Sequence, residues 1–390
     1  MSFVRFRRSL KLRLRRFLAR IFDSLLRYLR LTTRFYTWNL AASVGHMFSE
    51  TDFAMRMELG SASGYGLLAM YEAPICHEFC HIVRSKNLKV VAMDWLYKSL
   101  RLCGEYEKSS VVDAGLGNID IERRGRLRSK IDFKCSNSVY DYVFDVQYRE
   151  YYSLQSSQEG LYPLRDSVSR VIAGTEAREQ LGLLGERYIV VMRKEKTGNG
   201  SYALTELDTY RSTFEKLRGQ GYKIVWCGRE AVPDVYKDDV IHYSTSKHAS
   251  LRADVELIGN SRLCISDASG FGHMVDTLGV PLVYINCFQF IVPGSSRTVG
   301  LPDRLRIGNG RYLTPKEQYK VSKSIYQMDY SQCRYKSRTV RDNELERAVF
   351  EHLEGRIVAS SRFFGQLEGT GVENAAFKVP RWYWEETDWN

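Results

Sequence analysis

A short turn of small polar residues carries the clearest chemical signal in the sequence. The turn is Ser266–Gly270 (SDASG), and it lies between an apolar run typical of a buried strand and a stretch of helical periodicity that begins at Phe271. The first N–H groups of a helix have no partner within it, so they can hold an anion such as a phosphate. Gly272 adds a second glycine, but Val275 replaces the last glycine of a dinucleotide fingerprint. A nucleotide or sugar-nucleotide site is therefore predicted, with a plain Ser269 N-cap as the alternative.

Polar residues also follow three other predicted strands of this region. Open parallel sheets bind ligands at the carboxyl ends of their strands, so these residues are expected at the same edge as the turn. A cation there would neutralise a diphosphate leaving group, whereas solvated surface cations are the alternative. The residues concerned are Arg193 and Lys194 after the run 188–192, Gly228 and Arg229 after 222–227, and Asn286 at the end of 281–286.

A single histidine is the candidate general base. His46 follows Gly45 in a predicted loop after the first strand of the chain. A neutral imidazole in such a loop could face a ligand crevice and deprotonate an acceptor hydroxyl group. A lone histidine is more often structural, so this role depends on where the loop lies.

The segment His77-Glu78-Phe79-Cys80-His81 matches H-E-x-x-H. In zinc proteases this spacing places two histidine ligands one helical turn apart, with the glutamate as general base. A third ligand is not evident, because Arg84 and Asn87 occupy the positions of the extended motif's glycine and last histidine. Packing of a crossover helix is the favoured interpretation, and a zinc hydrolase is kept as an alternative.

Strands and helices alternate in two successive parts of the chain, which predicts βαβ units and parallel sheets. The expected fold class is α/β, with two Rossmann-like domains, a cleft between them and a basic amphipathic helix ahead of them. The predicted strands are 34–40, 65–71 and 88–93 in the first part, and 188–192, 222–227, 240–243, 262–266 and 281–286 in the second. The expected boundaries are 1–33 for the basic helix, 34–175 and 176–325 for the two domains, and 326–390 for a C-terminal helix and aromatic tail.

The N-terminal arm holds most of the excess charge. Residues 1–30 contain ten Lys/Arg and one Asp, so they carry +9 of the formal net charge of +11. Apolar residues at helical spacing alternate with these cations, which is typical of a helix lying on an anionic membrane surface. The arm is too charged to span a bilayer or to act as a signal peptide. The rest of the chain has no strongly basic balance, so no nucleic-acid partner is predicted. The eight scattered cysteines favour a reducing cytoplasm.

Ordered segments along the chain resemble a family of bacterial glycosyltransferases encoded among surface-polysaccharide genes. The similarity extends over about residues 40–365. The similar segments are Gly45-His46, Val191–Lys194, Tyr210–Gly221, Val225–Gly228, His242-Tyr243, Asp254, Cys264–Gly270, Pro281, Asn286 and Asn343–Glu351.

This resemblance implies two GT-B-like domains and sugar transfer from a nucleotide-activated donor to a glycan or lipid-linked acceptor, without a metal or other cofactor. The second domain would bind the donor and the first the acceptor. The protein would be cytoplasmic and peripheral on the inner face of the plasma membrane. A non-catalytic, membrane-bound sugar-binding or scaffold protein is a further alternative. His46 and Arg193 are the predicted catalytic residues. The predicted donor-binding residues are Lys194, Gly228, Arg229, Ser266, Asp267, Ser269, Gly270, Phe271, Gly272 and Asn286.

Overall fold

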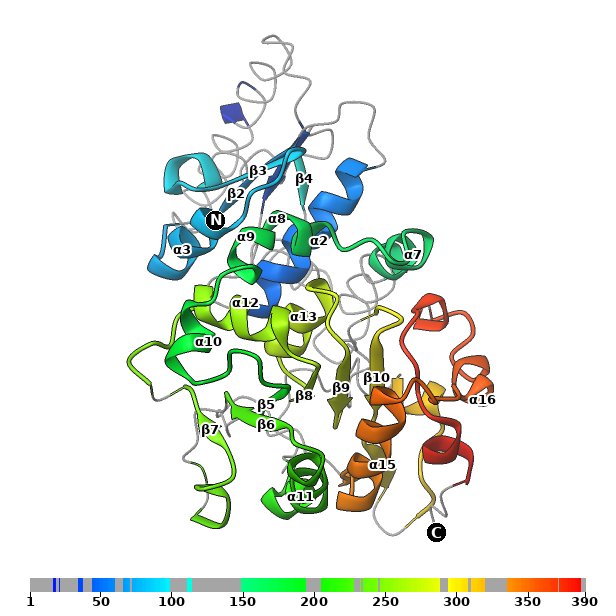
Figure 1. The fold of residues 1–390 in the computed structure, drawn as a ribbon. Helices are drawn as coiled ribbons and strands as arrows, with labels where there is room; N and C mark the ends of the chain where they lie inside the picture. The colour runs from blue at the N-terminus through cyan, green and yellow to red at the C-terminus, as the bar shows by residue number, and fades with distance from the viewer. Residues whose placement is uncertain are drawn as a thin grey trace, which may run out of the picture.

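A computed structural model gives the fold of the chain (Figure 1). Two parallel sheets lie at opposite ends of the molecule, and a layer of helices separates them. The structure describes residues 17–18, 21, 34–37, 44–59, 66–70, 72–98, 111–113, 149–193, 205–227, 232, 234–244, 246–287, 294–307, 310–319, 335–370 and 372–386.

The first domain is built on a four-stranded sheet in which the strand order is β3-β2-β1-β4 and every neighbouring pair is parallel. The first three strands confirm the predicted alternation, whereas β4 was not predicted. The elements are β1 (Arg34–Thr37), α2 (Val44–Leu59), β2 (Gly66–Met70), α3 (Pro74–Ile82), β3 (Leu88–Ala92) and β4 (Val111–Asp113), with residues 94–98 also helical.

The second domain contains a six-stranded parallel sheet of order β10-β9-β8-β5-β6-β7. When the domain's strands are numbered from β5 and the sheet is read from β7 to β10, this order is 3-2-1-4-5-6, which defines the doubly wound Rossmann fold. Five of the six strands were predicted, and β10 was not. The elements are β5 (Tyr188–Met192), α11 (Arg211–Gly219), β6 (Lys223–Trp226), β7 (Ile241–His242), α12 (Leu251–Asn260), β8 (Leu263–Asp267), α13 (Gly270–Thr277), β9 (Leu282–Ile285) and β10 (Thr298–Leu301).

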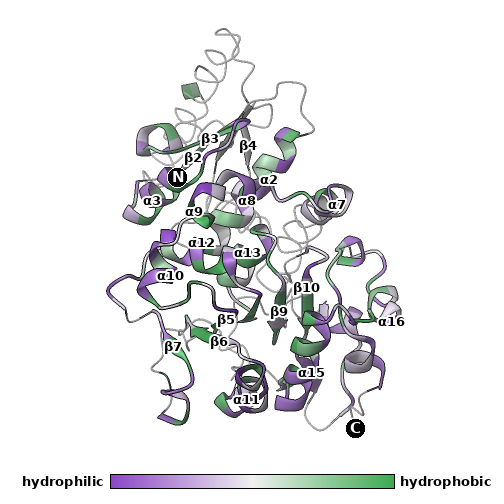
Figure 2. Cartoon of the chain, viewed as in Figure 1, coloured by the Kyte–Doolittle hydropathy of each residue, from purple (hydrophilic) through white to green (hydrophobic). Residues whose placement is uncertain are grey.

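Burial explains why the central strands form where they do. Every residue of β8 is buried, and so are the first four of β5. Strands covered on both faces are expected to read as continuous apolar runs, and Figure 2 shows both strands as largely hydrophobic. On α11, Phe214 packs against Trp226 of β6 with a ring-centroid distance of 6.2 Å, while the charged residues of that helix face outward. The amphipathic pattern of α11 thus fixes it to one face of the sheet.

Four short helices lead from the first domain into the second. Three of them follow one another between residues 163 and 180. Arg165 ties them to the second domain, because its guanidinium donates to the carbonyl oxygens of Leu278 at 2.7 Å and Gly259 at 3.3 Å. It thereby binds carbonyl groups at the C-terminal ends of α13 and α12. The helices are α7 (Arg149–Ser157), α8 (Pro163–Ser167), α9 (Ser169–Ile172) and α10 (Glu176–Gln180).

The two domains meet through α2 and α13, which pack against each other. A buried ion pair between Asp52 and Arg56, with an O–N distance of 2.6 Å, lies on α2. The Tyr151 hydroxyl of α7 donates to Asp52 at 3.0 Å, and the Gln155 amide of the same helix donates to Asp276 of α13 at 3.0 Å. Helix α7 therefore joins both domains by hydrogen bonds in the interior.

The C-terminal region packs on the β10 edge of the second domain. Lys378 pairs with Val299 of β10, and the buried Tyr383 donates its hydroxyl to the Pro302 carbonyl at 2.8 Å. The elements are β11 (Arg304–Ile307), β12 (Tyr335–Arg338), α15 (Asp342–Leu353), α16 (Ser361–Gly365) and the π-helical Trp382–Glu386, with 3-10 turns at Leu207–Tyr210, Asp234–Tyr236 and Val372–Asn374. The predicted helix over 342–353 is confirmed, and most of the tail aromatics serve as core residues.

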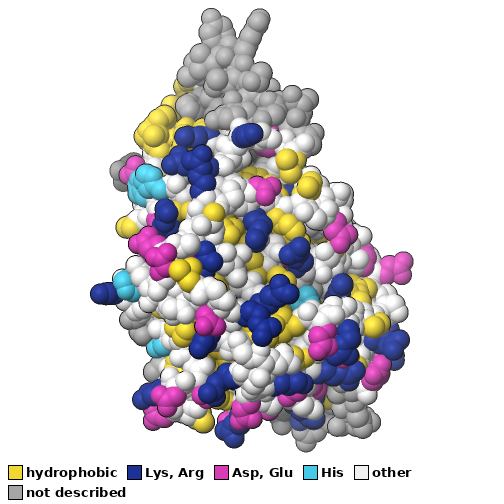
Figure 3. Space-filling view, in the orientation of Figure 1, with side chains coloured by type: hydrophobic (Ala, Val, Ile, Leu, Met, Phe, Trp, Pro, Cys, Tyr) yellow, Lys and Arg dark blue, Asp and Glu magenta, His cyan; other side chains and the backbone are white. Residues whose placement is uncertain are grey.

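The predicted basic helix over 1–33 lies almost entirely outside the described residues. Phe17, Leu18 and Ile21 are helical and exposed. No helix within the described ranges is both long and apolar enough to cross a membrane. On the face drawn in Figure 3, charged side chains of both signs are interspersed over the lower part of the molecule.

Asp303 makes the stability depend on pH. It is buried, and its carboxyl group accepts a hydrogen bond from the Ser337 hydroxyl at 2.5 Å. Burial raises the pKa of Asp303 from 3.8 to about 7. Because the folded state keeps this proton to a higher pH than the unfolded chain, stability falls as the pH rises from about 4 to about 7.

Asp303→Asn should therefore raise the free energy of unfolding at pH 8 by about 2 kcal/mol and by much less at pH 4. Urea denaturation at the two pH values measures this difference. An equal change in the free energy of unfolding at both pH values would contradict the raised pKa of Asp303.

Candidate functional site

The candidate site lies at the centre of the second sheet, where β5 and β8 are neighbours. Along the chain β5 is followed by β6 and β8 by β9, which lie on opposite sides of the β5–β8 pair. The carboxyl ends of two strands related in this way are where doubly wound sheets bind ligands, so we expect the crevice there. Met192 pairs with Ser266 in the register, so the residues that follow each strand lie side by side. The structure thus brings Arg193 next to the Ser266–Gly270 turn, as the sequence predicted.

The N-terminus of α13 has no side-chain cap. Ser269 is the N-cap residue, but its side chain makes no capping bond and instead donates to the Met192 sulfur at 3.5 Å. Among the described residues, no acceptor meets the N–H groups of Gly270 and Phe271. These two donors point out of the first turn of a helix, where an anion is stabilised.

Helix α12 in the same domain shows the opposite arrangement. The Ser250 hydroxyl accepts from the Ala253 N–H at 3.1 Å, and the Glu78 carboxylate accepts from the Arg252 N–H at 3.0 Å. Side chains of the protein therefore accept hydrogen bonds from two N–H groups in the first turn of α12. The two helices that cover the same sheet thus differ in whether side chains of the protein cap their N-termini.

A hydrogen-bonded chain holds Arg193 at the crevice. Its Nε donates to the Thr205 carbonyl at 2.9 Å. The Thr205 hydroxyl donates to Asp267, and the Asn286 amide donates to the same hydroxyl at 2.6 Å. Thr205 is a residue that the sequence analysis missed, since an isolated threonine after a long polar stretch carries no pattern. Arg193 is half-buried.

Three residues predicted to bind the donor have buried side chains that are engaged within the protein. Asp267 and Asn286 form the chain just described, and Ser266 donates to the Asp267 carbonyl at 2.8 Å. Asn286 also accepts from the Val340 N–H at 3.1 Å, and its φ of 53° lies in the left-handed region that asparagine tolerates better than most residues. These side chains shape the crevice and support Arg193, and their contact with a ligand stays a prediction.

Two predicted phosphate-contact glycines instead serve the packing of α13. A Cβ atom on Gly45 would lie 2.2 Å from the Gly270 Cα, so the backbones of α2 and α13 touch at this point. A Cβ atom on Gly272 would lie 2.3 Å from the Tyr284 ring. Gly270 is therefore approached by another helix and Gly272 by an aromatic ring, and contact of either glycine with a phosphate stays a prediction.

The predicted Gly45-His46 loop is wrong, because both residues belong to the first turn of α2. The N-terminal ends of α2 and α13 consequently meet, one from each domain. This places the His46 backbone near the candidate site, while its side chain lies outside the described residues. Lys194, Gly228 and Arg229 lie outside them as well.

The H-E-x-x-H segment is part of the contact between the domains. His77 and His81 are exposed on α3, and the Glu78 carboxylate is engaged by the first turn of α12. Burial, with a smaller contribution from Glu78, raises the pKa of the neighbouring Asp254 to about 6. No group of three His, Cys, Asp or Glu with metal-site geometry occurs in the part of the chain that the structure describes. The arrangement favours helix packing over the zinc-hydrolase alternative.

Glu78→Ala should accordingly lower the free energy of unfolding by about 1 kcal/mol, because a helix N-terminus loses a charged acceptor. His77→Ala should leave stability unchanged. Chemical denaturation compares the variants, and elemental analysis compares their zinc content. One tightly bound zinc per chain that is lost in His77→Ala would favour the zinc-hydrolase alternative over helix packing.

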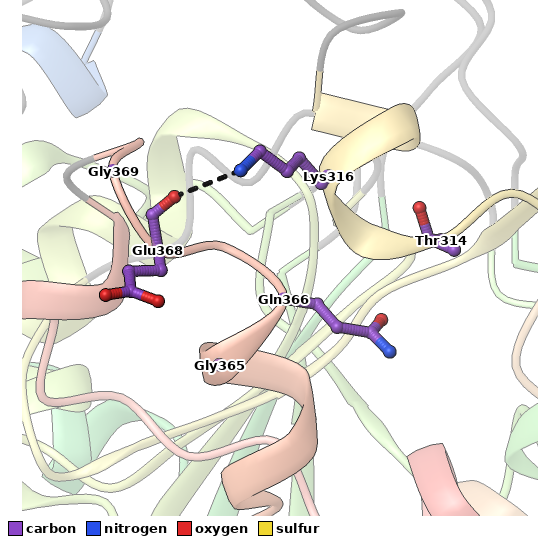
Figure 4. A pocket seen from close by; sticks show the side chains of 6 residues that line it. All are labelled: Thr314, Lys316, Gly365, Gln366, Glu368 and Gly369. Carbon is purple, nitrogen blue, oxygen red and sulfur yellow. Dashed lines mark hydrogen bonds between the residues drawn. The ribbon is translucent and has the colours of Figure 1, made fainter.

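A separate hollow of about 450 Å³ lies near the C-terminal tail (Figure 4). Its charged wall residue Lys316 donates to the Glu368 carbonyl at 3.4 Å. The remaining lining residues are Thr314, Gly365, Gln366 and Gly369. None of the predicted site residues lines it. We therefore place the candidate site at the strand ends.

Two Rossmann-type parallel sheets, joined by contact between α2 and α13, define a protein of the GT-B fold class. No protein family model matches the sequence, and no curated protein is similar to it.

Solved structures similar to this chain include E. coli ADP-heptose LPS heptosyltransferase II, with 14% identity, a TM-score of 0.48 and coverage of 83% of this chain and 99% of that one. A glycosyl transferase family 9 protein from Veillonella parvula has 12% identity, a TM-score of 0.46 and coverage of 83% and 97%. E. coli heptosyltransferase WaaC, solved with ADP-2-deoxy-2-fluoro heptose, has 11% identity, a TM-score of 0.38 and coverage of 65% and 88%. The fold assignment itself rests on the strand order of the two sheets.

Proposed function

We propose that this protein is a glycosyltransferase that moves a sugar from a nucleotide-activated donor to a glycan or lipid-linked acceptor. The observation that carries the proposal is the pairing of Arg193 with the uncapped N-terminus of α13 at the switch point of a Rossmann sheet. We infer that the two N–H groups and the guanidinium act on one ligand, a combination that suits a diphosphate better than any neutral ligand.

In this proposal the donor diphosphate lies against the Gly270 and Phe271 N–H groups and the Arg193 guanidinium. The bond between the sugar and the diphosphate breaks while the acceptor oxygen bonds to the sugar carbon. Negative charge grows on the departing diphosphate, and the fixed dipoles and the cation stabilise it without reorganisation. His46 would accept the proton of the acceptor hydroxyl, since it belongs to the first turn of α2, which meets α13. With these groups carrying the leaving-group charge, we propose a reaction that needs no metal.

The acceptor and the location of the enzyme are also proposals. The charge of residues 1–30 supports binding to an anionic membrane surface, and with it a position on the inner face of the plasma membrane. The first domain, whose helix α2 faces the candidate site, would then present a lipid-linked or glycan acceptor. Synthesis of a bacterial surface polysaccharide is the process that we infer.

A thermal-shift screen against nucleoside diphosphates and sugar nucleotides, followed by a turnover assay with the hits, tests the function. A ligand at about 100 times its dissociation constant should add roughly 2.7 kcal/mol of stability. Binding with sugar transfer supports the proposal. Binding without turnover would favour a sugar-binding or scaffold protein, and the absence of any stabilising nucleotide would contradict the donor site.

A further inference from the structure

Asn286 links the candidate site to a distant part of the chain. It directly follows β9, and among the residues that the structure describes it is the one non-glycine residue whose φ, at 53°, lies in the left-handed region. Its side-chain oxygen accepts from the Val340 N–H at 3.1 Å, while its amide nitrogen donates to the Thr205 hydroxyl at 2.6 Å. A non-glycine residue persists in this conformation only where its surroundings hold it there.

The position requires the side chain of asparagine. Asparagine tolerates the left-handed region better than most residues, and its amide group can accept one hydrogen bond and donate another at the same time. Glycine would fit the backbone but has no side chain, and an ionised aspartate could accept from Val340 but could not donate to Thr205. Because Asn286, Val340 and Thr205 are all buried, a lost bond would leave a polar group without a partner in the interior.

The segment 340–342 is anchored at its other end as well. The Asp342 carboxylate accepts from the Ser212 N–H at 3.1 Å and from the Ser212 hydroxyl at 2.7 Å. Ser212 belongs to the first turn of α11, the helix that follows β5. A helix that follows a parallel strand begins on the carboxyl side of the sheet. The segment therefore joins the residue after β9 to the start of α11, on the same side of the sheet as the candidate site.

Thr205 connects this anchored segment to Arg193. Its hydroxyl is held from two sides, because it accepts from the Asn286 amide and donates its single proton to Asp267 at the end of β8. Threonine has few accessible rotamers, so the two bonds fix the residue in the interior. The carbonyl of the same residue accepts from the Arg193 Nε at 2.9 Å. A displacement of Thr205 would therefore displace the Arg193 guanidinium.

We propose that segment 340–342 holds Arg193 in place for the donor diphosphate, with Asn286 and Thr205 as the positioning residues that connect the two. The proposal rests on the proposed function, in which the Arg193 guanidinium binds that diphosphate. It implies that a change at any point of this connection weakens donor binding only while Arg193 is present, because the effect passes through the guanidinium. Direct contact with the ligand, which the sequence predicted for Asn286, would not depend on Arg193 in this way.

A double-mutant cycle with ADP tests the proposal, by isothermal calorimetry of the full chain. Thr205→Val and Asn286→Gly should each lower ADP affinity by roughly fivefold, and Asp342→Ala by roughly threefold because it acts from further away. When each substitution is added to Arg193→Ala, it should change the remaining affinity by less than about twofold. Thr205→Ser keeps the hydroxyl group and should bind ADP as the unsubstituted protein does.

Two matched controls separate this connection from general effects on the fold. Thr213 is a buried threonine of α11 whose hydroxyl has no hydrogen-bond partner within the described part of the chain, so Thr213→Val makes the same change outside the connection. Asp239 is a carboxylate that binds α11 through Arg218, at the opposite end of the helix from Ser212. Thr213→Val and Asp239→Ala should both leave ADP affinity unchanged. Asn286→Gly guards against misfolding, because glycine adopts a φ of 53° without strain.

Weaker ADP binding in Arg193→Ala, together with unchanged affinity in Thr205→Val, Asn286→Gly or Asp342→Ala, would overturn the proposal and leave the proposed function intact. A loss of the same size with and without Arg193 would also overturn it, because the residues would then act on the ligand or on the fold directly. Unchanged ADP affinity in Arg193→Ala would contradict the proposed function, and the proposal would fail with it.

Discussion

Replacing Arg193 by alanine should lower the affinity for a nucleoside diphosphate by at least tenfold and the kcat/KM of sugar transfer by about 100-fold. A charge-assisted contact to phosphate is worth roughly 1.5–3 kcal/mol, and a donor aimed at developing charge contributes more in the transition state than in the ground state. The free energy of unfolding should fall by only about 1 kcal/mol, because the structural loss is the bond from Nε to the Thr205 carbonyl. Calorimetry with ADP and initial-rate kinetics measure the two effects.

Arg187 offers a matched control at the other end of the same strand. It immediately precedes β5, and its guanidinium donates to the Gln220 carbonyl at 2.6 Å. Arg187→Ala removes an arginine and a comparable hydrogen bond from the amino edge of the sheet, where no ligand is expected. The two variants should have similar stability and very different nucleotide affinity. Equal affinities would show that the donor binds elsewhere, and the proposed function of the second domain would fail.

Gly45→Ala should destabilise the protein by about 1–3 kcal/mol and weaken nucleotide binding as well. The added methyl group would meet Gly270 at 2.2 Å, and the atom in its way belongs to the backbone, so it cannot rotate aside. Helices α2 and α13 would have to separate, and the N-terminus of α13 would move relative to Arg193. Denaturation curves and ADP calorimetry on the same preparation give both effects.

Gly219→Ala is the control for the change of glycine to alanine itself. Gly219 ends α11, and a Cβ atom there would meet nothing within 4 Å, so this variant should be neutral or more stable by up to about 1 kcal/mol. Gly270→Ala tests the other side of this contact. If it weakened ADP binding with no loss of stability, direct contact with a phosphate would explain Gly270 better than helix packing.

The order of elements and the edge that carries the site could be predicted from sequence alone. Continuous apolar runs such as Tyr188–Met192 are strands because a sheet covered on both faces needs them, and their alternation with helices implies parallel pairing. Parallel strands place all their carboxyl ends on one edge, so Arg193 and Ser269 were expected together before any coordinates were known. This inference uses only local patterns and a general rule of topology.

Tertiary structure alone decided which polar groups face the crevice and which support it. Asp267 and Asn286 looked like ligand contacts, but Thr205 engages both of them after a stretch of sequence without any recognisable pattern. Similarly, Gly45 and Gly270 are 225 positions apart, and no local signal shows that their helices touch.

Strand β10 and the pairing of β11 with β12 were also outside the reach of the sequence analysis. Cross-strand register depends on which segments meet in space. From the sequence alone, basic residues in short strands look like solvent-exposed surface residues, because the residues opposite them are not known. Periodicity and strand ends are local properties, which a sequence displays directly. Contacts between distant segments depend on the packing of the whole chain, and for this protein they separate the groups that can bind a ligand from those that hold the site in shape.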